Sequence, residues 1–310
     1  MKIIFMGTPQ FAIPTLDALC KSNHQVIAVV TGEDKPRGRG QNISFTPIKT
    51  VALDYGIECL QPPTLKKSDF ISKLKSFDAD LFVVVAFKIL PKEVYSLPKY
   101  GSINAHTSLL PKYRGAAPIN WAIINGENET GITTFFLQDD VDAGEIILQQ
   151  KVNIPKTMDA GILHDTLAIK ASQTILDTIE LIEKFGKNIN LKKQNQTEVT
   201  LATKIFKENC KINWDQPFEK IYNFVRGLSP KPTAWTTNNK INYKIFRLSE
   251  ANVNFQKIKP GEIKIENGKI LVSTNDSWCE VLEIQKEGKN RLTSHEFLRG
   301  NSFEANAYFE

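Results

Sequence analysis

The sequence is poor in the residues that build metal centres and disulfide frameworks. Only four cysteines and four histidines occur among 310 residues. The cysteines, Cys20, Cys59, Cys210 and Cys279, lie far apart and form no Cys-x-x-Cys pair. This spacing argues against a zinc site or a disulfide framework and suits the reducing cytosol. We therefore expect inert, buried thiols, no metal and a cytoplasmic location.

Long apolar segments are also missing. The longest apolar run, Leu81 to Phe87, is far shorter than the ~20 residues that a membrane helix needs. At the N-terminus, the run from Ile3 to Met6 is broken by Gly7, whereas a secretory signal requires ~7 to 15 apolar residues. We expect a soluble protein that is neither exported nor bound to a membrane.

The chain lacks a large excess of one charge sign and lacks a dinucleotide-binding fingerprint. A net charge of +5 fits an anionic substrate or a tRNA bound at a local patch better than general coating of DNA. The first predicted strand ends at Gly7-Thr8-Pro9 and not at the G-x-G-x-x-G spacing that a pyrophosphate requires. This absence argues against a dinucleotide-dependent oxidoreductase.

What the first half of the sequence does contain is an alternation of strand and helix patterns. Strands are predicted at 2–6, 25–31, 57–60 and 81–87, and helices at 11–21, 47–55 and 68–77. This order predicts an α/β fold, with a Rossmann-like, mostly parallel sheet and helices on both faces. Ligands of such sheets bind at the carboxyl ends of the strands.

The later sequence indicates a second domain. Further strands are predicted at 131–137 and 144–152, followed by a long helix at 159–184. The polar segment from 186 to 203, which includes Gln194, is expected to bury little and to act as a linker. Short strands separated by glycine turns then predict a C-terminal OB-like antiparallel β-barrel. The expected boundaries are 1–184 for the catalytic domain, 185–204 for the linker and 205–310 for the barrel.

Two motifs carry groups suited to acyl transfer. Residues 102–118 read SINAHTSLLPKYRGAAP, and Asp142-Ala143-Gly144 follows about thirty residues later. Asn104 and His106 are two residues apart on a predicted extended segment, so both side chains point to one face. Acyl transfer to an amine needs a donor to the oxyanion and a base for the amine proton. Singly, each residue is typical of a turn; together they favour a catalytic function.

These motifs resemble the signature of the formyltransferases that use 10-formyltetrahydrofolate as the formyl donor and co-substrate. The resemblance implies that Asn104 donates to the oxyanion, that His106 acts as a donor or acid, and that Asp142 orients the histidine and manages protons. It also implies a folate-binding loop and a pterin pocket. The loop consists of Ser108, Leu109, Leu110 and Pro111; the pocket is lined by Phe87, Lys88, Ile89, Leu90, Gln138, Asp139, Asp140 and Val141. Lys88 stands where relatives commonly carry a small residue.

The catalytic motif leaves three acceptors open: glycinamide ribonucleotide, an amino-sugar nucleotide and the α-amine of methionyl-initiator tRNA. Enzymes for the first are usually single-domain, whereas this chain continues well beyond its catalytic region. The basic insertion at 34–42 resembles the family loop that enters the acceptor arm of initiator tRNA, with Arg39 matching its key arginine. Lys35, Arg37 and Arg39 can meet phosphates or stack on bases. We therefore expect a monomeric enzyme of translation initiation that formylates methionyl-initiator tRNA.

The C-terminal domain offers further positive charges for tRNA. A basic face is expected from Lys207, Lys211, Arg226, Lys231, Lys240, Lys244 and Arg247. The alternatives are a formyltransferase for an amino-sugar nucleotide and, in another class, a non-catalytic RNA-binding protein. The last would explain the loop and the barrel but would leave Asn104, His106 and Asp142 without a task.

Overall fold

The structure is a computed structural model that describes residues 1–37, 42–253 and 259–310. Its contacts divide the chain into two compact units. The first comprises Met1–Gly115, Thr130–Asn153 and His164–Ala202, and the second comprises Ala116–Glu129, Ile154–Leu163 and Thr203–Glu310. No helix in the described part of the chain combines the length and the apolar character needed to cross a bilayer.

A seven-stranded sheet forms the centre of the first unit, in the order β10-β9-β7-β6-β1-β2-β5. Its strands are β1 (Lys2–Gly7), β2 (Gln25–Val30), β5 (Cys59–Leu60), β6 (Leu81–Val85), β7 (Ser102–His106), β9 (Glu129–Phe136) and β10 (Ile146–Asn153). Neighbouring strands from β5 to β7 are parallel, whereas β7 pairs with β9 antiparallel. The expected mostly parallel sheet is confirmed.

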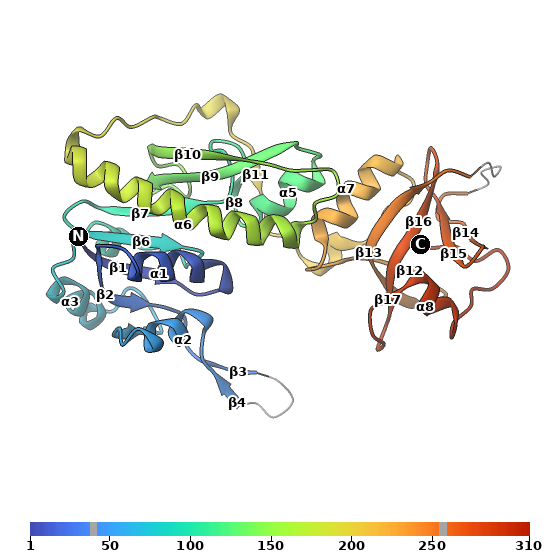
Figure 1. Cartoon of the computed structure of the whole chain (residues 1–310), viewed down its shortest axis with the longest axis horizontal. Helices are drawn as coiled ribbons and strands as arrows, with labels where there is room; N and C mark the ends of the chain where they lie inside the picture. Colours follow the sequence, from blue (N-terminus) through green and yellow to red (C-terminus); the bar gives the residue numbers. More distant parts are fainter. Residues whose placement is uncertain (38–41, 254–258) are drawn as a thin grey trace. The chain divides into compact units, whose positions relative to one another are not determined.

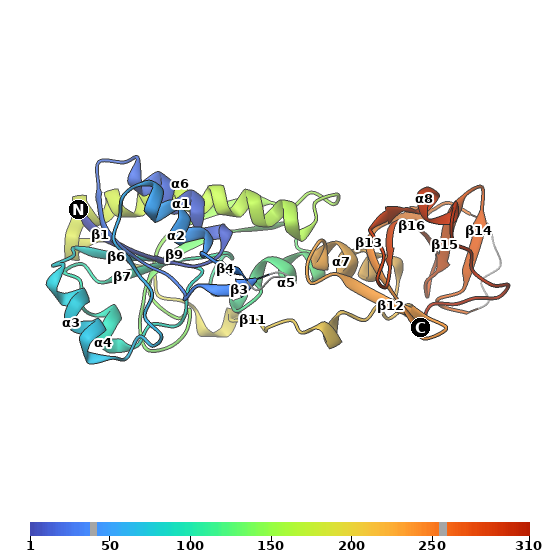
Figure 2. The ribbon, with the colours of Figure 1, turned by 90° about the horizontal axis from the view of Figure 1, so that it is seen from below.

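Helices cover both faces of this sheet, as predicted (Figure 1). They are α1 (Ile13–Cys20), preceded by the 3-10 turn Gln10–Ala12, α2 (Pro47–Asp54), α3 (Ser68–Ser76), α4 (Lys92–Tyr95) and α6 (Ala160–Phe185). Figure 2 shows α1 and α6 on one face and α3 and α4 on the other. The central strand β6 is apolar throughout and every one of its residues is buried, which is typical of a strand covered on both faces.

Chain order within the sheet determines where a ligand can bind. From β1 the chain runs outward to β2 and β5, and it then returns to the other side of β1 to form β6 and β7. This reversal places the carboxyl ends of β1, β6 and β7 beside one another, where open sheets of this kind bind their ligands. Asn104 and His106 lie at the carboxyl end of β7.

Short elements complete the first unit. They are β3 (Lys35–Arg37) paired with β4 (Asn42–Ser44), β8 (Arg114–Gly115) paired with β11 (Leu201–Ala202), and the 3-10 turns Gly186–Asn188 and Gln196–Glu198. The β8–β11 pairing fastens the end of the polar 186–203 segment to the signature motif.

The second unit contains the antiparallel sheet predicted for the C-terminal part. Its strands are β12 (Ala234–Asn238), β13 (Ile241–Ala251), β14 (Ile263–Glu266), β15 (Lys269–Ser273), β16 (Trp278–Lys286) and β17 (Leu292–Thr293). Its helices are α5 (Pro118–Ile124), α7 (Phe218–Leu228) and α8 (Ser294–Leu298), with a 3-10 turn at Lys207–Cys210. Trp214 and Phe309 stack at 5.8 Å within the buried core of this unit.

Candidate active site

Two of the three expected site residues, His106 and Asp142, meet at the end of β7 within the first unit. His106 and Asp142 lie against each other, with Nδ1 and Oδ2 3.7 Å apart, and their side chains are 7% and 11% exposed. Asn104 lies two residues before His106 on the same strand. Its side chain is half-buried, and no hydrogen bond to it is found among the described residues. An amide in this condition is available to donate to a ligand.

Hydrogen bonds define the state of the His106 ring. Nε2 lies 2.8 Å from the main-chain oxygen of Tyr113. A carbonyl oxygen can only accept, so Nε2 carries a hydrogen in this arrangement. Nδ1 faces the Asp142 carboxylate at 3.7 Å, which is too long for a direct hydrogen bond.

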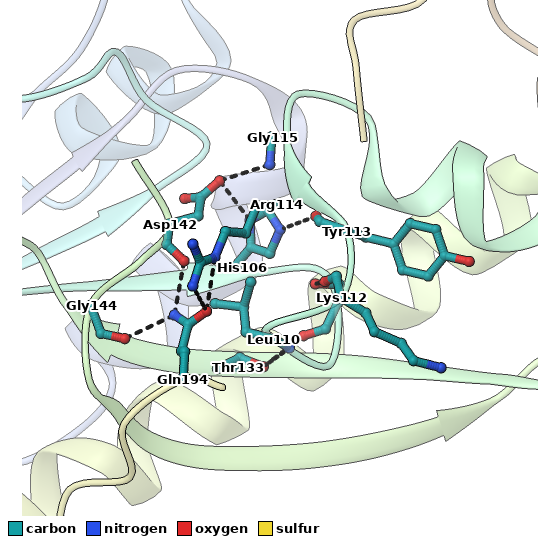
Figure 3. Close-up of polar contacts among 11 residues, drawn as sticks. His106, Leu110, Lys112, Tyr113, Arg114, Gly115, Thr133, Asp142, Gly144 and Gln194 are labelled. Atoms are coloured by element: carbon teal, nitrogen blue, oxygen red, sulfur yellow. Dashed lines mark hydrogen bonds and ion pairs between the residues drawn. The ribbon is translucent and has the colours of Figure 1, made fainter. Parts of the chain in front are cut away.

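One main-chain N–H holds the Asp142 carboxylate in place. The N–H of Gly115 donates to Oδ2 at 3.0 Å (Figure 3). Gly115 has φ +121°, and a Cβ there would lie 2.7 Å from the Ala202 carbonyl oxygen. The glycine in the Arg-Gly-Ala-Ala-Pro motif is therefore required by both the backbone angle and the approach of β11.

Left-handed backbone angles gather at this site. Ala86, Tyr113 and Asp142 have φ of 49°, 61° and 53°, a region that non-glycine residues rarely adopt. Ala86 directly follows β6, Tyr113 supplies the acceptor for His106, and Asp142 supplies the carboxylate. Strained residues persist where the surroundings determine them, and they are concentrated at functional sites.

Hydrogen bonds to Lys112 and Thr133 hold the predicted folate loop in place. Ser108 is fully buried, and its hydroxyl donates to the Lys112 carbonyl at 2.6 Å. The Thr133 hydroxyl donates to the Ser108 carbonyl at 2.6 Å and accepts from the Leu110 N–H at 3.1 Å. Thr133 also accepts from Gln149. These contacts fix the path of 108–111 beside His106, while Leu110 itself is buried.

The predicted pterin wall divides between a cavity and exposed loops. A cavity of about 470 Å³ is lined by Lys88, Ile89, Leu90 and Asp139, together with Lys66, Lys92 and Tyr95. Residues 108–111 do not line this cavity, and Asp140 and Val141 are exposed. The Tyr95 hydroxyl donates to Asp139 at 2.6 Å; this hydrogen bond raises the pKa of Tyr95 to about 12 and lowers the pKa of Asp139.

The predicted tRNA loop begins and ends on a short hairpin. Lys35 and Arg37 belong to β3, whereas Arg39 lies outside the described residues. At the base of the hairpin, the Asp34 carboxylate accepts from Lys49 and from Gln61, the latter at 2.9 Å. These bonds lower the pKa of Asp34. The base of the insertion is thereby tied to α2 and to the residue after β5.

The prediction was wrong for one residue of the expected basic face, Arg226, which is buried. Arg226 is 7% exposed, and its guanidinium donates to Asn223 at 2.8 Å and to the Met158 carbonyl at 2.8 Å. Burial lowers the pKa of this guanidinium. Its position on α7 makes it a structural residue of the second unit, because its hydrogen-bonding groups face inward.

The sequence interpretation also missed a residue of the site. Gln194 is 7% exposed, which contradicts the expectation that its segment buries little. Its amide donates to the carbonyls of Asp142 and Gly144 at 2.8 and 2.9 Å and accepts from Arg114 (Figure 3). Periodicity gives no signal for this burial, because all three partners are distant in the sequence.

Comparison with known proteins agrees with the class of protein that this fold and site define. The model described as formyl transferase matches residues 1–179, and the model described as formyl transferase, C-terminal domain, matches residues 204–302. A curated methionyl-tRNA formyltransferase from Bacteroides fragilis is 42% identical over 309 residues, covering 97% of this chain and 95% of that protein. The chain belongs to the methionyl-tRNA formyltransferase family.

Solved structures show the same fold at low sequence identity. WlaRD, a sugar 3N-formyl transferase crystallised with dTDP and 5-N-formyl-THF, has a TM-score of 0.67 at 21% identity and covers 94% of this chain and 99% of its own. HypX from Aquifex aeolicus in complex with tetrahydrofolic acid has a TM-score of 0.63 at 16% identity and covers 96% of this chain. The present chain spans about half, 47%, of the HypX chain.

Proposed function

We propose that this protein transfers the formyl group of 10-formyltetrahydrofolate to the α-amine of methionyl-initiator tRNA. The observation that carries the proposal is the pairing of His106 with Asp142 at the carboxyl end of β7, the strand that also carries Asn104. The name of the Bacteroides relative supports methionyl-tRNA as the acceptor. The folates in the titles of the WlaRD and HypX structures support a folate donor.

The proposed reaction begins when the α-amine attacks the formyl carbon and forms a tetrahedral oxyanion. The Asn104 amide donates to this oxygen, and the neighbouring His106 ring adds positive charge when it is protonated. The carbon–nitrogen bond to N10 of the folate then breaks. In balance, the amine loses one proton and N10 gains one, so no net acid or base is consumed.

Asp142 has two tasks in this scheme. Its carboxylate faces Nδ1 of His106 at 3.7 Å and stabilises the protonated ring. Asp142 also takes part in transferring the proton that leaves the amine, because its carboxylate lies beside His106. Proton transfer by a positioned group contributes about 100- to 10,000-fold to a rate. The surroundings of the trio are largely dry, since His106 and Asp142 are both nearly buried.

The proposed functions divide along the chain at the domain boundaries predicted from the sequence. We propose that residues 1–184 carry catalysis, that 185–204 connect, and that 205–310 contact tRNA together with Lys35, Arg37 and Arg39. The folate is proposed to contact the loop 108–111 and the residues at 87–90 and 138–141. We further propose that the enzyme works as a cytoplasmic monomer.

One experiment, in which two acceptors are offered in separate mixtures, tests the proposed substrates. The purified protein is given 10-formyltetrahydrofolate with methionyl-initiator tRNA, or with an amino-sugar nucleotide, and the formylated product is identified by mass spectrometry. We expect N-formylmethionyl-tRNA from the first mixture and no product from the second. Formylation of the sugar alone would assign the other acceptor, and tRNA binding without transfer would assign a non-catalytic RNA-binding protein.

A further inference from the structure

Gln194 is a buried amide in a segment of otherwise exposed polar residues. Lys193 and Asn195 on either side are exposed, yet Gln194 is only 7% exposed. All four of its hydrogen-bonding positions are used. Nε2 donates to the carbonyls of Asp142 and Gly144 at 2.8 and 2.9 Å, and Oε1 accepts from Nε and Nη2 of Arg114 at 2.9 and 2.7 Å. A buried side chain that is satisfied so completely defines one geometry.

The two carbonyls that Gln194 binds belong to the turn that carries the catalytic carboxylate. Asp142 has φ 53°, a left-handed conformation that residues other than glycine adopt uncommonly. The amide of Gln194 joins the carbonyls on both sides of Ala143, so it holds the turn in this conformation. The Asp142 side chain then reaches the Gly115 N–H and faces His106.

Arg114 connects the same amide to the opposite loop. Its guanidinium binds Gln194 through two nitrogens, and the next residue, Gly115, donates its N–H to Asp142 at 3.0 Å. Main chain near Gln194 adds further ties: Lys192 exchanges hydrogen bonds with Ile146, each at 2.9 Å. The loops at 113–115 and 142–144 are thus fixed to each other through the segment that contains Gln194 (Figure 3).

We propose that Gln194, oriented by Arg114, is a positioning residue for formyl transfer that acts through Asp142. This inference rests on the proposed function, because Asp142 must take part in the reaction for its position to matter. Gln194 does not touch the reacting atoms. It keeps the carboxylate against His106, and a displacement of about 1 Å at such a site can cost about 100-fold in rate.

Two substitutions separate the parts of this role. Gln194→Ala removes the whole amide, whereas Gln194→Glu keeps the size and the pairing with Arg114 but has no N–H to donate to the two carbonyls. Both are expected to lower kcat by about 10- to 100-fold while KM for folate and for tRNA stays within about twofold. Gln173→Ala is the matched control, because Gln173 is an exposed glutamine of α6 whose one side-chain hydrogen bond among the described residues is to its helix neighbour Asp177.

A double-mutant cycle distinguishes positioning from general support of the fold. In an Asp142→Ala background, measured by single-turnover formylation of labelled methionyl-tRNA, Gln194→Glu is expected to change the remaining rate by less than about twofold. A residue that merely supported the fold would lower the rate by the same factor in both backgrounds. Thermal denaturation confirms that each variant is folded at the assay temperature.

The outcomes distinguish this inference from the proposed function. If the unmodified protein does not formylate methionyl-tRNA, the proposed function fails. If it does, but Gln194→Glu retains the normal kcat, or if the losses are fully additive with Asp142→Ala, the positioning role fails while the proposed function stands. Loss of kcat in Gln194→Glu together with non-additivity supports it.

Discussion

The substitution Gly144→Ala tests how tightly the turn that carries Asp142 is packed. An ideal Cβ at this position would lie 1.8 Å from the Phe136 carbonyl oxygen and 2.8 Å from the ring of Phe135. The nearer obstacle is main chain, which cannot rotate away as a flexible side chain can. We therefore expect Gly144→Ala to force apart the chain at 136 and the turn that carries Asp142.

The size of the displacement follows from the contact. To restore a Cβ distance of 3.0 Å, the two segments must separate by at least about 1.2 Å. Overpacking of this kind costs about 3 kcal/mol in the free energy of unfolding, which corresponds to a fall in Tm of ~6 to 12 °C for a unit of this size. A shift of that length at Asp142 is expected to lower kcat by about 100-fold.

Calorimetry and steady-state formylation measure the two effects in the same preparations. Gly300→Ala is the matched control, because within the described part of the chain no heavy atom lies near its added Cβ. We expect that control to change the free energy of unfolding by less than about 0.5 kcal/mol and to leave kcat unaltered. A Gly144→Ala protein with normal Tm and normal kcat would refute the packing argument.

Other measurements test the proposed tRNA loop and the surroundings of Cys20. Arg39→Ala is expected to raise KM for methionyl-tRNA about tenfold without changing KM for folate; equal kinetics with tRNA would remove the loop from recognition. Asp34→Asn is expected to raise the same KM, because the single amide oxygen cannot accept from both Lys49 and Gln61 as the two carboxylate oxygens do. The pKa of Asp34 is lowered in the folded protein, so its hydrogen bonds stabilise the fold fully above the unfolded carboxyl pKa of roughly 3.9. This stabilisation is lost as the pH falls through the lower pKa of the folded state. Loss of the stabilisation near neutral pH would contradict this assignment. Burial raises the pKa of Cys20 to about 11, so its reaction with a disulfide reagent at pH 8 should be slow until the protein is denatured, and rapid reaction of the native protein would exclude that environment.

Regular elements of the first unit could be predicted closely from the sequence. The helix predicted at 159–184 is observed at Ala160–Phe185, and the strand predicted at 81–87 is observed at Leu81–Val85. These elements depend on local periodicity and on continuous apolar runs, both of which are visible in a single sequence. Strand direction was harder: β9 runs antiparallel to β7, and the apolar pattern of a buried strand does not encode its direction.

The polar interior could not be predicted in the same way. Gln194 lies 80 residues from Arg114 and 52 from Asp142 in the sequence, and its polar neighbours resemble those of a linker. Arg226 is similar, since its burial depends on carbonyls at Pro155 and Met158. The burial of such groups is determined by long-range hydrogen bonds, which composition and spacing do not reveal. Motifs in the sequence predicted the candidate catalytic residues, while the burial of Gln194 and its hydrogen bonds required coordinates.

We propose that His106 and Asp142, beside Asn104, carry out formyl transfer. Single-turnover formylation of methionyl-initiator tRNA, compared among the unmodified protein, His106→Ala and Asp142→Asn, tests these roles. We expect rapid transfer by the unmodified protein and rates lower by about 100- to 10,000-fold in each variant, with folding intact. Near-normal rates in either folded variant would contradict the roles assigned to these side chains.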